Sequence, residues 1–304
     1  MKMASVTSLL KYYPLPAALK TIADAGYEGV ELWGGFPHAW SEDFYNGDTM
    51  DKPTIDGCVR LIRDSGLELV SYLPEQCFYP VNFLVDDTPP FDAARLAERS
   101  LRYFERAIDV AAALGSPHMA LTTPFWGWER KSGEYVHTRI KRIDRVVTIF
   151  KRLAKRAERV GVVLIVEPLT HLETTSVETL DDSLEMLDGV GSQHLQMMID
   201  TGHANVTARK LGEDSAAYFR RNVDVLGSRL RHIHLSDNLG DLDAHLLPGD
   251  GNFDFANAYA TLKAANYRGF LSAEIMMFGA NPVPPAPVVL LAKTRADCLR
   301  LWNG

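Results

Sequence analysis

The chain has 304 residues, 46% of them apolar and 23% charged, and it carries a formal net charge of −7. A net negative charge argues against a general affinity for nucleic acid, and the longest apolar runs are too short to span a bilayer. The first residues contain no long apolar stretch followed by a cleavage site, so we expect a cytoplasmic protein. The cysteines, Cys58, Cys77 and Cys298, are far apart and odd in number, which predicts neither a disulfide framework nor a zinc site.

A pattern of amphipathic helix, glycine and short apolar strand repeats along the chain. Its clearest copies cover residues 19–33, 59–73, 108–123 and 153–168, and looser copies cover 184–200, 223–237 and 259–275. In the clearest copies apolar residues recur every three or four positions before the glycine, which is typical of a helix that ends in the left-handed conformation. An opening strand near 3–8 and a final helix near 287–302 complete eight strands that alternate with helices.

Strands that alternate with helices form a parallel sheet, because each helix carries the chain back to the start of the next strand. Eight such units favour a closed (β/α)8 TIM barrel that forms a single domain over residues 1–304. An open doubly wound sheet is the alternative, but no GxGxxG turn follows the first strand. The long segments after strands, 33–51, 73–91, 122–137 and 236–252, would meet at the carboxyl-terminal rim and could wall a pocket.

Four consecutive strands end near an acid or a histidine. Five apolar residues, 162–166, lead directly into one of these acids, although an ionised carboxylate is costly in a buried strand. Several carboxylates that converge at one rim repel one another unless a cation neutralises them. Three carboxylates and one imidazole suit Mn²⁺, with Mg²⁺, Co²⁺, Fe²⁺ or Zn²⁺ as alternatives. The predicted metal ligands are Glu167, Asp200, His234 and Glu274.

The roles of two nearby histidines, His232 and His203, have alternatives. His232 and His234 share a strand face, and we choose His234 as the ligand because it lies nearer the carboxyl end of the strand. His232 then either touches the site or is a hydrogen-bonded core histidine. His203, three residues beyond Asp200, either binds a substrate hydroxyl or is a histidine at the start of a helix.

The motifs "GVELWGGFPHAW", "YLPEQCFYPVN", "EPLTHLE", "MIDTGH", "HIHLSD", "DAHLLPGDGNFDF" and "SAEI" resemble the xylose-isomerase-like barrel superfamily of sugar isomerases and epimerases. The pattern is most similar to fructoselysine 3-epimerase and the D-tagatose and D-psicose 3-epimerases, and it extends from about residue 27 to residue 274. The resemblance implies that the four ligands hold Mn²⁺ or Co²⁺ and that Glu167 and Glu274 are the catalytic acid and base. It also implies that Glu173, His203 and His245 contact substrate, and that Trp33, His38 and Glu75 line the entrance.

The resemblance predicts a divalent-metal-dependent sugar epimerase or isomerase. It would abstract a proton beside a carbonyl, at C3 of a ketose or ketose conjugate, and pass through an enediolate that the metal stabilises. Residues 125–135 are rich in aromatic side chains and residues 276–289 are apolar and rich in proline, which suggests a bulky or aromatic substrate or a partner subunit over the rim. A lyase that removes the aglycone from a 3-oxo C-glycoside, with such a partner subunit, is therefore an alternative.

Two further alternatives are weaker. A barrel that only binds sugar has no need for two glutamates at one metal, and an abasic-site endonuclease would need more zinc ligands and a basic face. We expect the partners to be a small sugar or sugar conjugate and, in a homo-oligomer, further copies of the chain, with neither nucleic acid nor membrane.

Overall fold

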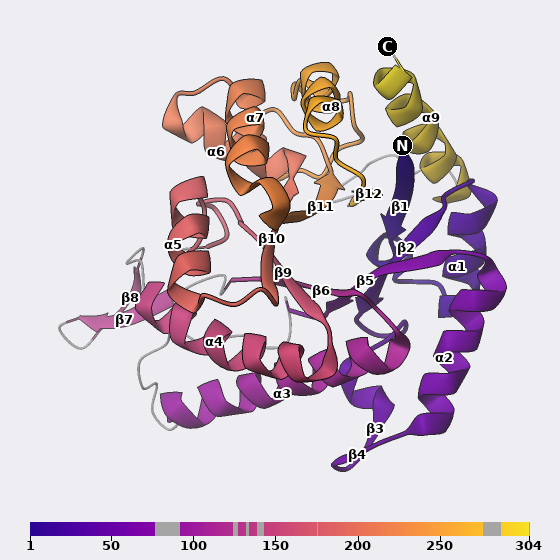
Figure 1. Ribbon diagram of the computed structural model, residues 1–304, viewed down its shortest axis with the longest axis vertical. Helices are drawn as coiled ribbons and strands as arrows, with labels where there is room; N and C mark the ends of the chain where they lie inside the picture. Colours follow the sequence, from indigo (N-terminus) through magenta and orange to yellow (C-terminus); the bar gives the residue numbers. More distant parts are fainter. Residues whose placement is uncertain are drawn as a thin grey trace.

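A computed structural model describes residues 1–76, 92–123, 127–131, 134–138, 143–174, 176–275 and 287–303 (Figure 1). Parallel strands from these residues close into an eight-stranded barrel in the order β1-β12-β11-β10-β9-β6-β5-β2, which confirms the predicted (β/α)8 fold. Cys77, Trp126 and most of the segment 276–289 lie outside the described residues. The barrel strands are β1 Lys2–Val6, β2 Gly29–Gly34, β5 Glu68–Pro74, β6 His118–Thr122, β9 Val163–Glu167, β10 Leu195–Asp200, β11 Leu230–Leu235 and β12 Phe270–Ala273.

Helices surround the strands (Figure 1). Most follow the predicted alternation, but two helices rather than one connect β10 to β11. Short 3-10 helices cover Thr7–Leu10, Ser41–Phe44 and Gly227–Arg229. None of the described helices is long and apolar enough to cross a membrane. The α-helices are α1 Leu15–Asp24, α2 Lys52–Ser65, α3 Ala93–Leu114, α4 Ile143–Val160, α5 Leu180–Val190, α6 Thr201–Leu211, α7 Ser215–Leu226, α8 Phe255–Ala264 and α9 Pro287–Asn303.

The strand β9 shows how the barrel separates its two apolar layers. Leu164 and Val166 belong to the main core, which also contains helix residues such as Leu153 of α4. Ile165 points the other way and packs with residues of β6 and β10 in a separate buried cluster. Alternate residues of a strand share a face, so Glu167 lies on the same side as Ile165 and faces the barrel interior. The apolar run therefore ends in an acid at the inner rim.

Two of the connections predicted as loops contain antiparallel hairpins. After β2, strand β3 (Tyr45–Asn46) pairs with β4 (Thr49–Met50). After β6, strand β7 (Gly127–Lys131) pairs with β8 (Glu134–Thr138), and this hairpin projects away from the barrel in Figure 1. Each hairpin satisfies backbone groups in a connection too long to be a tight turn.

Candidate metal centre and substrate pocket

Four residues at the carboxyl-terminal ends of successive strands converge inside the rim. Each offers one ligand atom, these atoms lie within 4.8 Å of one another, and all four residues are buried. Two of them are the last residues of β9 and β10, the third is the last but one of β11, and the fourth directly follows β12. The four residues are the predicted set, Glu167, Asp200, His234 and Glu274.

Asp200 shows why an acid is placed where β10 meets α6. Its Oδ1 accepts hydrogen bonds from the backbone N–H groups of Gly202 and His203, at 2.6 and 3.0 Å, and so caps the helix. The same oxygen accepts a third hydrogen bond from Ser236 Oγ at 2.7 Å. A Cβ at position 202 would lie 2.3 Å from that Oγ, so only glycine fits there. The other oxygen, Oδ2, is left to face the cluster.

Two carboxylate oxygens of the cluster indicate that a cation fits there. Glu167 Oε1 and Asp200 Oδ2 are buried and have no hydrogen-bond partner among the described residues. A buried carboxylate oxygen without a partner is costly, and a divalent ion removes that cost. Three carboxylates and one imidazole nitrogen are a donor set that Mn²⁺ and similar ions accept. The four residues therefore fit a divalent metal, whose identity the donor set leaves open.

The buried side chains of the cluster shift one another's pKa values. Burial raises the pKa of Glu167 to about 7. Burial would lower the pKa of His234, but the carboxylates of Glu274, Glu31 and Glu167 raise it well above its usual value. His234 Nδ1 lies 2.9 Å from Glu274 Oε2 and 3.4 Å from Glu167 Oε1. For Glu274, burial is outweighed by His234, which lowers the pKa of that carboxyl. The two glutamates thus differ in proton affinity.

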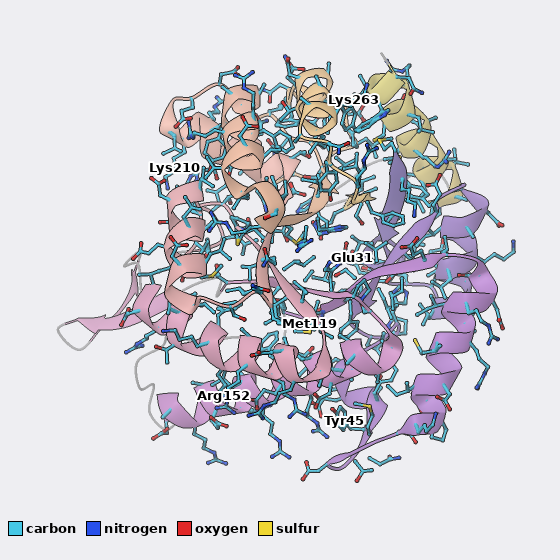
Figure 2. The ribbon with its side chains drawn as sticks, in the orientation of Figure 1. Glu31, Tyr45, Met119, Arg152, Lys210 and Lys263 are labelled. Atoms are coloured by element: carbon cyan, nitrogen blue, oxygen red, sulfur yellow. The ribbon has the colours of Figure 1, made fainter. Side chains whose placement is uncertain are left out.

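Glu31, in the middle of β2, supports the cluster from below, and we did not predict it. Its Oε2 lies 3.0 Å from His234 Nε2 and 2.8 Å from His232 Nε2, and all three side chains are buried. Figure 2 shows Glu31 inside the ring of strands. A carboxylate on one imidazole nitrogen fixes the tautomer and turns the other nitrogen toward a metal. His232 is thus hydrogen-bonded to the same Glu31 oxygen that contacts the predicted ligand His234.

Asp243, which we also did not predict, lies between two histidines. His245 Nε2 is 2.7 Å and His203 Nε2 is 3.4 Å from Asp243 Oδ2. The opposite nitrogens face the cluster: His203 Nδ1 lies 3.4 Å from Glu167 Oε1, and His245 Nδ1 lies 3.1 Å from the backbone oxygen of Glu274. Burial opposes protonation of His245, but Asp243 raises its pKa to about 10. These distances connect the rim loop to both glutamates.

The loop that carries Asp243 and His245 is folded back over the barrel by Asp237. The Asp237 carboxylate accepts hydrogen bonds from the backbone N–H groups of Gly249 and Gly251, each at 2.9 Å, and of Phe253 at 3.2 Å. His245 has a φ of 44°, in the left-handed region that side chains rarely adopt. Strained backbone of this kind persists where surrounding contacts hold it, and here the imidazole is held at both nitrogens.

The predicted substrate residues gather around a cavity of about 110 Å³ above the cluster. His38 is placed differently: its ring nitrogens lie 3.0 Å from Thr7 Oγ1 and 3.0 Å from the backbone oxygen of Tyr13. It packs edge to face against Trp33, with ring centroids 5.7 Å apart. The predicted residues that line the cavity are Trp33, Glu75, Glu167, Glu173, His203, His245 and Glu274.

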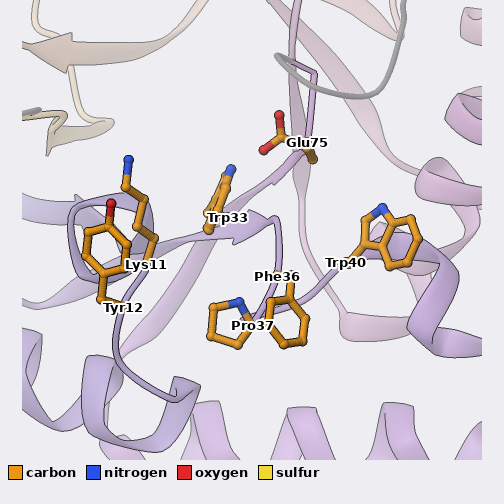
Figure 3. Close-up of a pocket in the computed structure, with 7 residues that line it drawn as sticks. All are labelled: Lys11, Tyr12, Trp33, Phe36, Pro37, Trp40 and Glu75. Atoms are coloured by element: carbon orange, nitrogen blue, oxygen red, sulfur yellow. The ribbon is translucent and has the colours of Figure 1, made fainter.

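A second, larger pocket of about 730 Å³ opens beside this cavity (Figure 3). In Figure 3, Trp33 lies between Lys11 and Tyr12 on one side and Glu75 and Trp40 on the other. Trp33 and Glu75 line both spaces. The two are thus neighbouring compartments, which we call the inner cavity and the outer pocket. Phe36 and Pro37 complete the lining of the outer pocket.

Curated relatives of the chain include sugar epimerases. Fructoselysine 3-epimerase of Shigella flexneri is 28% identical over 278 residues, which cover 88% of this chain and 87% of that protein. D-psicose 3-epimerase of Enterocloster bolteae is 30% identical over 159 residues, which cover 52% of this chain and 44% of that protein.

Solved structures share the fold. The apo form of 3-keto-D-glucoside 4-epimerase from E. coli superimposes with a TM-score of 0.74 at 18% identity, and 99% of each chain is covered. The sequence profile described as "Xylose isomerase-like TIM barrel" matches residues 19–295. The chain therefore belongs to the xylose isomerase-like TIM barrel family.

Proposed function

We propose that this protein is a divalent-metal-dependent sugar epimerase that transfers protons beside a carbonyl group, at C3 of a ketose or ketose conjugate. One observation carries the proposal: two glutamates, Glu167 and Glu274, belong to one ligand cluster and line the cavity above it. Relatives named as epimerases of fructoselysine and D-psicose support the class of reaction and of substrate.

Epimerisation needs two proton-transfer groups, one for each face of the reacting carbon. One glutamate takes the proton as the C–H bond breaks, and the electron pair moves toward the carbonyl oxygen to form an enediolate. The other glutamate returns a proton to the opposite face. Glutamate carboxylates at hydrogen-bonding distance of the reacting carbon are competent acids and bases for this exchange. A bound divalent ion, for which we favour Mn²⁺, would act as a Lewis acid toward the negative charge on the substrate oxygens.

The residues around the two glutamates orient the substrate. His203 and His245 line the inner cavity, and each imidazole has one nitrogen directed to Asp243. His203 Nε2 has no hydrogen-bond partner among the described residues, so it can donate to a sugar hydroxyl. His245 is held at both nitrogens and forms part of the cavity wall. Glu173 is held in place by Thr170, whose Oγ1 donates to Glu173 Oε2 at 3.0 Å, and it lines the same cavity. Since the Glu173 carboxylate only accepts hydrogen bonds, it suits a further hydroxyl.

Isotope exchange tests the proposal. Protein treated with chelator is incubated in D₂O with D-fructose, D-psicose, D-tagatose or fructoselysine, with and without added Mn²⁺ or Co²⁺. We expect deuterium at the carbon beside the carbonyl only when metal is present. If neither this panel nor amino-linked conjugates of D-fructose exchange in the presence of either metal, the proposed reaction is refuted.

A further inference from the structure

The outer pocket has the size and lining of a ligand site of its own. Its volume of about 730 Å³ falls within the range of roughly 300 to 1,000 Å³ that small-molecule pockets occupy. Among the described residues, four aromatic side chains and a proline line it, together with the charged groups of Lys11 and Glu75. The ketose chemistry of the inner cavity uses none of the rings of Tyr12, Phe36 or Trp40.

Two of these rings are left in contact with water. Tyr12 is 87% exposed and Phe36 is 78% exposed, and both face the same pocket. A single exposed apolar residue is ordinary, but several that line one concave space mark a binding site. Flat rings around a pocket favour a flat apolar ligand, because stacked and edge-to-face contacts add to the gain from burying apolar surface.

The outer pocket borders the proposed reaction site. Trp33 and Glu75 line both compartments. A sugar placed over Glu167 and Glu274 would therefore lie on one side of Trp33, and any substituent of that sugar could pass it into the outer pocket. The Trp33 ring is also fixed in position, because His38 packs against it and is itself hydrogen-bonded at both nitrogens.

We propose that the substrate is a sugar conjugate whose non-sugar part carries an aromatic ring, and that this ring binds in the outer pocket against Tyr12, Trp33 and Phe36. This inference rests on the proposed function, since it places the sugar in the inner cavity. Trp33 is the boundary between the two parts of the ligand. A free sugar of the same configuration would fill only the inner compartment.

Matched ligands test the inference by binding rather than by turnover. We would compare 1-deoxy-1-methylamino-D-fructose, 1-deoxy-1-(2-phenylethylamino)-D-fructose and its cyclohexylethyl analogue, which share one ketose and one amine. Titration calorimetry with the Mn²⁺-loaded protein should give at least about tenfold tighter binding for the phenylethyl conjugate than for the methyl conjugate. The cyclohexylethyl conjugate should bind more weakly than the phenylethyl conjugate, because it cannot stack on the rings.

Variants of the outer pocket test whether the preference for the phenylethyl conjugate arises there. Phe36→Ala and Tyr12→Ala change exposed side chains, so both should fold, and each should reduce the preference for the phenylethyl conjugate at least threefold. Val225→Ala, which removes a half-exposed apolar side chain on α7, should leave the preference unchanged.

The outcomes separate this inference from the proposed function. If the methyl conjugate binds and exchanges deuterium but the phenylethyl group adds no affinity, the inference is overturned and the epimerase proposal stands. Equal affinities for the phenylethyl and cyclohexylethyl conjugates would also overturn the aromatic assignment. If no conjugate binds and no free sugar exchanges, the proposed function itself fails.

Discussion

Glu274 combines two tasks that a substitution can separate. It offers a ligand atom to the cluster and is one of the two proposed proton carriers. Glu274→Gln keeps an oxygen for the metal but removes the ability to carry a proton. We expect the rate of epimerisation or deuterium exchange to fall by more than about a hundredfold, since acid and base groups typically contribute 10² to 10⁴. Glu68→Gln, at an exposed ion pair with Lys2, is the control and should leave the rate unchanged. A near-normal rate for Glu274→Gln would remove it from the mechanism.

Asp243 holds two imidazoles with one carboxylate oxygen. Since that negative charge favours the protonated imidazole, Asp243→Asn should lower the pKa of His245 by more than one unit from about 10. NMR titration of the histidine ring protons in metal-free protein measures this shift directly. We also expect KM to rise more than kcat falls, with metal content unchanged, because Asp243 is a positioning residue. An unaltered His245 titration would show that the carboxylate does not control it.

Among the elements, α3 and α4 are joined by charged side chains on the outside of the barrel. Arg152 of α4 contacts Glu98 and Glu105 of α3, each with an N to O distance of 2.7 Å. Figure 2 shows Arg152 beside these helices, outside the ring of strands. Arg156 pairs with Asp109 one turn along, at 2.5 Å. A single exposed ion pair contributes little to the free energy of unfolding. A network in which one arginine contacts two carboxylates contributes more, because its geometry is better fixed.

We expect Arg152→Ala to lower the free energy of unfolding by about 1 kcal/mol at low salt, and by less at 1 M salt because the charges are screened. Urea denaturation at both salt concentrations measures the difference. Lys155→Ala is the control, since the described residues show no ion pair for Lys155 and its loss should have little effect. Equal destabilisation at low and high salt would mean that Arg152 acts through packing of its aliphatic part.

The carboxyl-terminal ends of the strands could be predicted from the sequence, because parallel strands of a barrel end at one rim. That rule alone brings Glu167, Asp200, His234 and Glu274 together. It could not find Glu31, which lies in the middle of β2. Which mid-strand residues meet across a barrel depends on the stagger of the strands, and that is set only when the barrel closes.

Loop residues were hard to predict for a different reason. The connection 236–252 has no periodicity, and its path depends on backbone N–H groups that donate to Asp237. Asp243 precedes His245 by two residues, but nothing in that spacing says that both face His203. His38 lies in a motif that the resemblance assigned to the entrance, whereas in the structure its hydrogen bonds hold it behind the ring of Trp33.

At the scale of the whole molecule, the metal centre connects four adjacent strands, β9 to β12, about half of the barrel wall. Without metal, these strands bring three carboxylates together, and Glu167 then holds its proton up to a pH of about 7. A carboxyl whose folded pKa is raised binds more protons in the folded than in the unfolded state. The metal-free barrel should therefore lose stability as the pH rises from about 4.5 through 7.

Metal binding should reverse this pH dependence, because the ion requires the deprotonated carboxylate. We expect Mn²⁺ at a hundredfold excess over its Kd to stabilise the protein by about 2.7 kcal/mol and to raise Tm by several degrees at pH 7.5. At pH 5.5 the same Mn²⁺ concentration should raise Tm much less, because protons compete for Glu167. Thermal melts of chelator-treated protein at both pH values measure the two shifts.

The double variant Glu167→Gln, Asp200→Asn is the control for this experiment. It removes the charges of the two oxygens that have no hydrogen-bond partner, so its Tm should respond weakly to Mn²⁺ at either pH. Its metal-free form should also lose less stability between pH 5.5 and 7.5 than the unchanged chain, because the titrating carboxyl is gone. If the variant and the unchanged chain gain the same Tm from Mn²⁺, the ion stabilises the barrel somewhere other than at the strand ends.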